Sequence, residues 1–134
     1  MDETIIMELL RGVDRYSVNV HLFEDEDAEF VTISLYYNNR LYQGKDESFF
    51  EALVQLRSML EKDGMLLVCN GSYKNVYPSP MMLRMGTGRM AYVLTLGQQA
   101  KMADVVDIFE NTVKGDLCSV SEQCMYYREW LHSL

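Results

Sequence analysis

The side chains that could carry catalysis or bind a metal ion are few and scattered. His21 and His132 are the only histidines, and no HExxH, CxxC or nucleophile-elbow motif occurs in the chain. The sequence leaves open a catalytic pair of a histidine with a cysteine or a serine, because such partners meet in space rather than in sequence. An odd number of cysteines without a close pair argues against a disulfide framework and a zinc site: Cys69, Cys118 and Cys124. We therefore predict free thiols, with Cys69 buried, and no catalytic residue, metal ion or cofactor.

One turn has the residue types of a phosphate site. Residues 86–89 read Gly-Thr-Gly-Arg, in which the glycines let backbone amides approach an anion and Arg89 adds positive charge. A P-loop or dinucleotide site needs a helix directly after such a turn, whereas the apolar run of residues 90–96 predicts a strand. We keep as the alternative hypothesis a small enzyme, or an anion- or ligand-binding module, that uses residues 71–89.

The charge of the chain is distributed unevenly. Residues 64–103 contain no Asp or Glu, although the chain has a net charge of −8. The other residues carry all 20 acidic side chains and eight of the 12 basic ones, a balance of −12. The sequence thus predicts a positive island in an acidic protein, formed by Lys74, Arg84, Arg89 and Lys101.

The centre of this island, residues 70–89, has no clear periodicity but is too apolar for a disordered segment. Long connections inside small domains are usually functional, so we expect an ordered loop that packs on the sheet. Its aromatic and methionine side chains either complete the core or form a binding surface, since Tyr, Met and Arg are enriched at protein interfaces. The candidate partner-binding residues of the loop are Tyr73, Lys74, Tyr77, Arg84 and Arg89.

A run of acidic residues offers a second candidate surface. Residues 24–29 hold five carboxylates but lack the spacing and the turn glycine of an EF-hand loop. They predict either a solvated hairpin tip or a contact with a basic partner through Asp25, Glu26 and Asp27. The net negative charge disfavours nucleic acid as the main partner and suits a basic protein, although acidity also simply aids solubility.

Helices are predicted in three places. Residues 4–10 place isoleucines and leucines at helical spacing before Gly12, which predicts a short N-terminal helix. Ser48 and Glu51 form a capping-box pattern that opens a helix over about residues 49–63. Ser119 and Glu122 form a second such pattern, which opens a C-terminal helix to about residue 132.

Strands are predicted from alternating or continuous apolar residues. Alternation predicts strands at residues 16–22 and 30–37, joined by the acidic tip, and 41–42 continues after an Asn-Asn turn. The continuous apolar run of residues 65–69 predicts a strand in the centre of the sheet. Residues 90–96 predict another strand, and a helical turn near residue 100 precedes a last short strand within residues 105–109. The order of elements favours one α+β domain over residues 1–134, with a mostly antiparallel four- to five-stranded sheet packed by a central and a C-terminal helix.

Length and composition place the protein among soluble, unexported chains. No apolar run approaches the length of a membrane helix, and the N-terminus lacks the pattern of a secretory signal. Free cysteines suit a reducing compartment, so we expect a cytoplasmic location and no membrane partner. The oligomeric state is left open by the sequence.

Three segments resemble a group of small bacterial immunity proteins, which are encoded beside polymorphic or contact-dependent toxins. They are NGSYKNVYPS (residues 70–79), MGTGRMAY (85–92) and VVDIF (105–109), and the similarity covers about residues 65–130. The resemblance implies a protein that is not an enzyme and that binds a cognate toxin in the cytoplasm. It implies no catalytic residues, and it leaves the activity of the toxin open.

Overall fold

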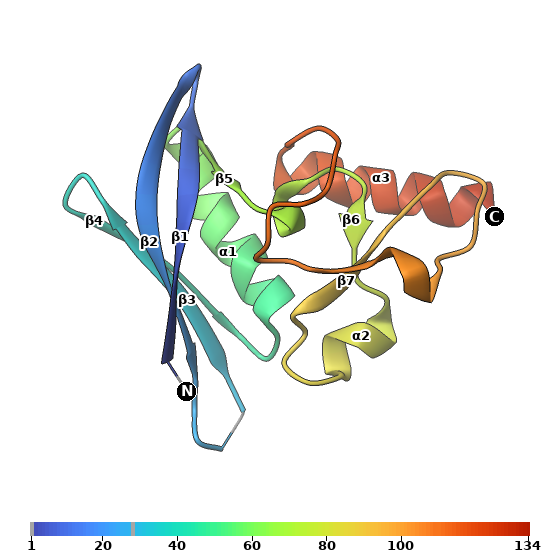
Figure 1. Ribbon diagram of the computed structural model, residues 1–134, viewed down its shortest axis with the longest axis horizontal. Helices are drawn as coiled ribbons and strands as arrows, with labels where there is room; N and C mark the ends of the chain where they lie inside the picture. Colours follow the sequence, from blue (N-terminus) through green and yellow to red (C-terminus); the bar gives the residue numbers. More distant parts are fainter. Residues whose placement is uncertain (1, 28) are drawn as a thin grey trace.

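The first half of the chain builds a five-stranded antiparallel sheet with the strand order β4-β3-β2-β1-β5 (Figure 1). The computed structural model describes residues 2–27 and 29–134. The elements of this larger sheet are β1 (Asp2–Arg11), β2 (Asp14–Glu24), β3 (Val31–Tyr37), β4 (Arg40–Asp46), helix α1 (Phe49–Lys62) and β5 (Met65–Val68).

One face of this sheet packs against α1. In β2, Val18, Val20 and Leu22 are buried while the residues between them are exposed, as the predicted alternation requires. Helix α1 contributes a buried stripe that includes Leu53 and Leu56. The helix lies so close to β4 that a Cβ on Gly44 would overlap the carbonyl of Ala52, so this position accepts only glycine. The predicted strands at 16–22 and 30–37, the turn at 38–39 and the helix that follows are confirmed.

The N-terminal helix predicted for residues 4–10 is wrong, because this segment forms β1. Every residue from Asp2 to Arg11 pairs with β2, and Met7 and Leu9 point into the core. The apolar residues of this segment also satisfy helical spacing, so local pattern did not separate the two states. The long ladder with β2 decides the conformation, and this tertiary pairing overrides the local spacing.

The prediction that residues 65–69 form a central strand is also wrong. β5 lies at the edge of the sheet and pairs with β1 only. It is nevertheless apolar on both faces, and α1 packs against it. Met65, Leu67 and Val68 are buried without a second neighbouring strand.

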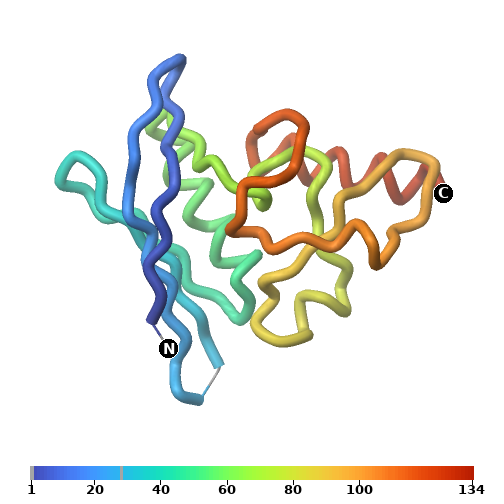
Figure 2. The backbone as a smooth tube through the Cα atoms, viewed as in Figure 1, coloured from blue at the N-terminus to red at the C-terminus, as the bar shows by residue number. Residues whose placement is uncertain are grey.

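The second half of the chain forms a smaller three-stranded antiparallel sheet of order β6-β7-β8 (Figures 1 and 2). The predicted loop at 70–89 is ordered, as expected, but it contains short elements of its own. The helical turn and short strand predicted after residue 100 are confirmed, and the strand predicted at 90–96 ends at Val93. The elements are η1 (Asn70–Ser72), β6 (Val76–Tyr77), α2 (Pro80–Arg84), β7 (Met90–Val93), η2 (Met102–Asp104), β8 (Val105–Asp107) and α3 (Val120–Ser133).

The two capping patterns differ in how far they are realised. At α3 the full box forms, since Ser119 accepts from the amide of Glu122 and the Glu122 carboxylate accepts from the amide of Ser119. At α1, Ser48 accepts from the amide of Glu51 at 3.2 Å. The carboxyl group of Glu51, however, shares a hydrogen bond with Asp46, which raises the pKa of Glu51. Only half of the box predicted at α1 is therefore confirmed.

A buried arginine ties the second half of the chain to α1. Arg57 is 2% exposed, and its guanidinium donates to Gln123 Oε1 at 2.6 Å, to the Cys118 carbonyl at 3.0 Å and to the Gly71 carbonyl at 3.1 Å. The amide of Gln123 in turn donates to three carbonyls, among them that of Val76. This pair therefore joins α1, η1, β6 and α3 through buried polar contacts.

Among the residues that the structure describes, no helix is both long enough and apolar enough to span a bilayer.

Candidate partner-binding surfaces

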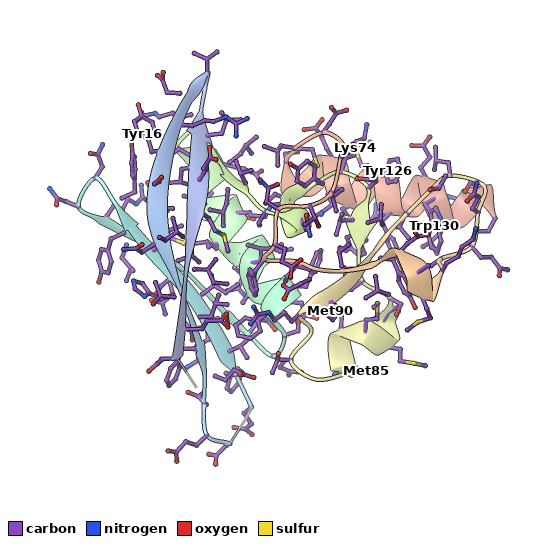
Figure 3. All side chains as sticks on the ribbon, in the orientation of Figure 1. Tyr16, Lys74, Met85, Met90, Tyr126 and Trp130 are labelled. Carbon is purple, nitrogen blue, oxygen red and sulfur yellow. The ribbon has the colours of Figure 1, made fainter. Side chains whose placement is uncertain are left out.

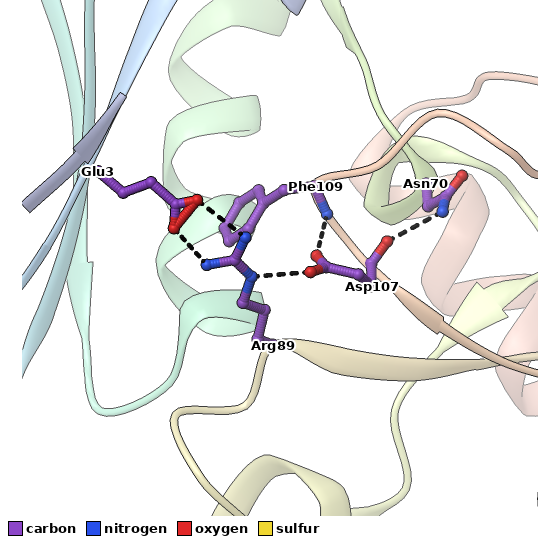
Figure 4. Close-up of polar contacts among 5 residues, drawn as sticks. All are labelled: Glu3, Asn70, Arg89, Asp107 and Phe109. Carbon is purple, nitrogen blue, oxygen red and sulfur yellow. Dashed lines mark hydrogen bonds and ion pairs between the residues drawn. The ribbon is translucent and has the colours of Figure 1, made fainter. Parts of the chain in front are cut away.

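Arg89, a predicted partner contact, forms a tie between the two halves of the chain (Figure 4). Its guanidinium donates to both carboxylate oxygens of Glu3 on β1, at 2.8 and 3.2 Å, and to Asp107 Oδ2 at 2.9 Å. It also lies over the ring of Phe109, 5.2 Å from the ring centroid. The hydrogen bond between Arg89 and Glu3 raises the pKa of Arg89 and lowers the pKa of Glu3, so both groups stay ionised at neutral pH. The cluster as a whole carries one net negative charge.

The backbone around Asp107 is held in place by Asn70. Asn70 Nδ2 donates to the Asp107 carbonyl at 2.9 Å, and Asn70 Oδ1 accepts from the amides of Thr112 and Val113 at 2.9 Å each. Asn70 is fully buried. The first residue of η1 thus fixes the segment that follows β8, and no local sequence pattern signals this role.

The glycine-rich turn at residues 86–89 caps helix α1. The carbonyls of Thr87 and Gly88 accept from the amides of Phe49 and Phe50, at 2.7 and 3.2 Å. Gly88 has a φ of +69°, and a Cβ there would lie 2.5 Å from the Cβ of Ser48. The turn offers carbonyl oxygens to the positive end of the helix, so its glycines serve backbone packing. The phosphate-binding alternative gains no support from this geometry.

Two of the predicted contact residues pack within the protein. The ring of Tyr77 lies between Phe50, at 5.1 Å, and Tyr127, at 4.1 Å, and Tyr127 is followed by Trp130 at 6.0 Å. Burial raises the pKa of Tyr77. Tyr73 is half-buried, and its hydroxyl donates to Asn111 Oδ1 at 3.1 Å. Of the two alternatives for the aromatic residues of the loop, core packing describes these two tyrosines.

Other candidates from the sequence are exposed but lie apart. Lys74 is exposed, with its ammonium 5.9 Å from the centroid of the Tyr126 ring (Figure 3). Arg84, at the end of α2, is exposed, and its Nη1 lies 3.6 Å from Glu47 Oε2.

The acidic tip connects β2 and β3, on the opposite side of the molecule from α3 (Figure 1). The Asp25 amide donates to the Phe30 carbonyl, Glu26 and Asp27 are exposed, and Ala28 lies outside the described residues. The structure does not bring this tip together with the loop.

A surface that the sequence indicated only in part is rich in methionine, since Met81 and Met85 lie in the predicted loop whereas Met90 and Met102 lie outside it. Four methionines are between 40% and 78% exposed, and we call them the Met-rich surface: Met81 of α2, Met85 directly after α2, Met90 of β7 and Met102 of η2. Figure 3 shows Met85 and Met90 projecting beside α2 and β7. Arg84 and Lys101 adjoin these methionines in sequence. Ten methionines in 134 residues were the signal that could have pointed here.

The candidate catalytic side chains have surroundings that do not activate them. His21 lies exposed on β2, with Nδ1 3.1 Å from Thr4 Oγ1. Cys69 is fully buried, and this burial raises the pKa of its thiol, which lowers its reactivity. Burial also raises the pKa of Cys118, whereas Cys124 is half-buried, and all three cysteines are free.

An open groove of about 600 Å³ lies between β1 and the segment after β8. Its lining comes from both halves of the chain and includes Ile5, Met7, Arg89 and Phe109. The Arg89 cluster therefore stands at the side of this groove. Compared with known proteins, the chain matches no family model and no curated protein.

Proposed function

We propose that this protein acts by binding another protein, and that it is an immunity protein that neutralises a cognate bacterial toxin by direct contact in the cytoplasm. The observation that carries the proposal is the Met-rich surface. Methionine side chains are flexible and polarisable, and they recur at surfaces that adapt to a partner. Exposed apolar side chains gathered on neighbouring elements are a common mark of an interaction site.

The charge distribution supports a division of roles between two surfaces. Arg84 and Lys101 adjoin the methionines, and positively charged and apolar groups together can anchor a partner. The acidic tip is exposed but has little apolar area to bury, which suits long-range attraction of a basic toxin rather than a tight contact. Neutralising Asp25, Glu26 and Asp27 should therefore slow association and flatten its salt dependence without changing dissociation.

The test is co-expression with the toxin encoded by the neighbouring gene, combined with binding of the two purified proteins. The wild-type chain should protect cells from growth arrest. The variant Met81→Glu with Met102→Glu should lose protection and bind about 30-fold or more weakly, the effect of losing an interface hot spot. Val13→Glu is the matched control, because Val13 is 93% exposed at the β1–β2 turn, away from this surface.

Two results would contradict the proposal. The first is growth arrest in cells that contain the wild-type chain and the toxin at equal levels. The second is equal protection by the double variant and the Val13 control, which would remove the Met-rich surface from the interface.

A further inference from the structure

Strand β1 has an edge that is only partly paired. β2 pairs with β1 along its whole length, whereas β5 pairs only with Glu8–Arg11 of β1. The chain leaves the sheet after Val68 and turns into η1. Within the described residues, the ladder on this side of β1 therefore stops at Glu8 and leaves the edge of residues 2–7 without a neighbouring strand. Such an edge presents a row of backbone N–H and C=O groups that can pair with another chain.

The open groove of about 600 Å³ lies along the part of this edge that is formed by residues 5–7. It is lined by Ile5 and Met7, which point toward α1, and by Ile6, which points to the opposite face of the sheet. Because residues from both faces of β1 line the same groove, the groove lies at the edge of the strand. It begins at Val68, where β5 ends, so it continues the position of β5 in the sheet.

The opposite wall of the groove is held apart from β1 by its own contacts. This wall is formed by residues 107–112. The Glu110 carbonyl accepts from the Asn70 amide at 2.6 Å, and the Thr112 amide donates to Asn70 Oδ1 at 2.9 Å. The wall is thus fixed to η1, and Arg89 bridges it to Glu3 at one end. The groove thus has one side fixed by hydrogen bonds and the edge of β1 on the other side.

The charges around the groove select the chemistry of its occupant. Among the described residues that line it, Glu8, Asp107 and Glu110 are acidic and Arg89 is basic, which gives the lining a formal charge of −2. Asp107 is paired with Arg89 and Glu8 with Arg15, so Glu110 carries the charge that is not used within the protein. Ile6, 74% exposed, offers apolar surface. A second copy of this chain would bring another acidic β1 and a like net charge, which opposes pairing.

We propose that the groove beside β1 binds an extended, basic segment of a partner protein, which adds to the larger sheet as a strand next to residues 2–7. Main-chain hydrogen bonds supply the pairing, and alternate side chains meet Ile6 and the acidic rim. This inference is independent of the Met-rich surface and of the toxin-binding role.

The experiment uses the full chain and a synthetic peptide, acetyl-Lys-Val-Lys-Ile-Lys-Val-Lys-amide, as the probe. Two control peptides are compared: one with Glu in place of Lys, and one with every backbone amide methylated so that it keeps its charge but has no backbone N–H to donate. The basic peptide should bind and should slow hydrogen exchange of amides in residues 2–7. The acidic and methylated peptides should bind at least tenfold more weakly.

Protein variants locate the site. Glu110→Lys should weaken binding of the basic peptide about tenfold, because it reverses a charge on the groove wall. Glu129→Lys, the same reversal on exposed α3, should change binding less than twofold. Urea midpoints of both variants establish that each is folded.

The proposal is overturned if the basic peptide does not bind at 1 mM, or if the methylated peptide binds equally well. It is also overturned if the two charge reversals have equal effects. Sedimentation showing a dimer that excludes the peptide would assign the edge of β1 to a second copy and would likewise overturn it.

Discussion

Replacing the buried arginine of α1 should loosen the attachment of the second half of the chain. Arg57→Leu removes the donors to three acceptors, but the Gly71 carbonyl keeps its hydrogen bond from Gln123 at 2.9 Å. Two buried acceptors lose their Arg57 donor, the Cys118 carbonyl and Gln123 Oε1. Each unsatisfied buried group costs about 1–3 kcal/mol.

A gain partly offsets this loss. Burial lowers the pKa of Arg57, because the charged guanidinium has lost its water, and leucine removes that desolvation cost. We therefore expect a net loss of about 3 kcal/mol in the free energy of unfolding. For a chain of this size that corresponds to a fall of roughly 10–15 °C in Tm.

The assay is urea unfolding followed by two probes. Trp130 is the only tryptophan, and its indole donates to the Gln98 carbonyl at 2.9 Å, so its fluorescence reports the packing of α3. Circular dichroism reports the larger sheet and α1 together. In the variant the fluorescence transition should come first.

In a double-mutant cycle with Gln123→Leu, two effects oppose each other. The second change removes the orphaned acceptor Gln123 Oε1, but it also takes the last donor from the Gly71 carbonyl. A loss below about 0.5 kcal/mol for Arg57→Leu, the size of a surface change, would refute this account.

Three further outcomes test other contacts. Gly86→Ala, at φ +56° in open space, should cost about 1–2 kcal/mol, and Gly88→Ala roughly 1–3 kcal/mol more from overlap with Ser48; equal urea midpoints would contradict the packing described. The pKa of Glu3 is lowered by its hydrogen bond with the arginine, so its stabilisation is present above its ordinary pKa of 4.5 and is lost as pH falls through the folded value. Glu3→Gln should therefore destabilise by about 1 kcal/mol or less at pH 7, with the difference shrinking below pH 4.5 and vanishing once the pH is below the lowered pKa of Glu3. A difference that grows in acid would be inconsistent with this pairing. A thiol reagent should label Cys124 first in the native protein and all three cysteines after unfolding, as mass spectrometry can count.

Local pattern was sufficient where one periodicity or one cap dominates. β2 alternates cleanly, and α1 and α3 begin at serines that do accept from the third helical amide. It failed at β1, where Ile5, Ile6, Leu9 and Leu10 fit a helix as well as a strand and only the ladder with β2 decides. It also misplaced β5, because apolar residues on both faces indicate burial without saying what covers the strand.

The candidate surfaces could be predicted only in part, because a count of charges along the chain does not show which charged side chains form ion pairs in the fold. Arg89 was counted as a free positive charge, but its partner Glu3 lies 86 positions away. Tyr77 was indistinguishable from a surface aromatic until β6 placed it against Phe50. The unpaired edge of β1 depends on where β5 stops, which is a fact of sheet pairing that no single segment contains.

The capping of α1 by the turn at residues 86–89 has a consequence for the protein during its synthesis. The amides of Phe49 and Phe50 find their acceptors, Thr87 and Gly88, only after about 40 more residues have been made, which at 5–20 residues per second takes on the order of 2–8 s. The ring of Phe49 packs against the ring of Phe109, which is synthesised later still. A nascent chain therefore exposes two adjacent aromatic side chains beside a newly formed hairpin for seconds. Translation speed, rather than native stability, sets how long the nascent chain is open to aggregation and to chaperones.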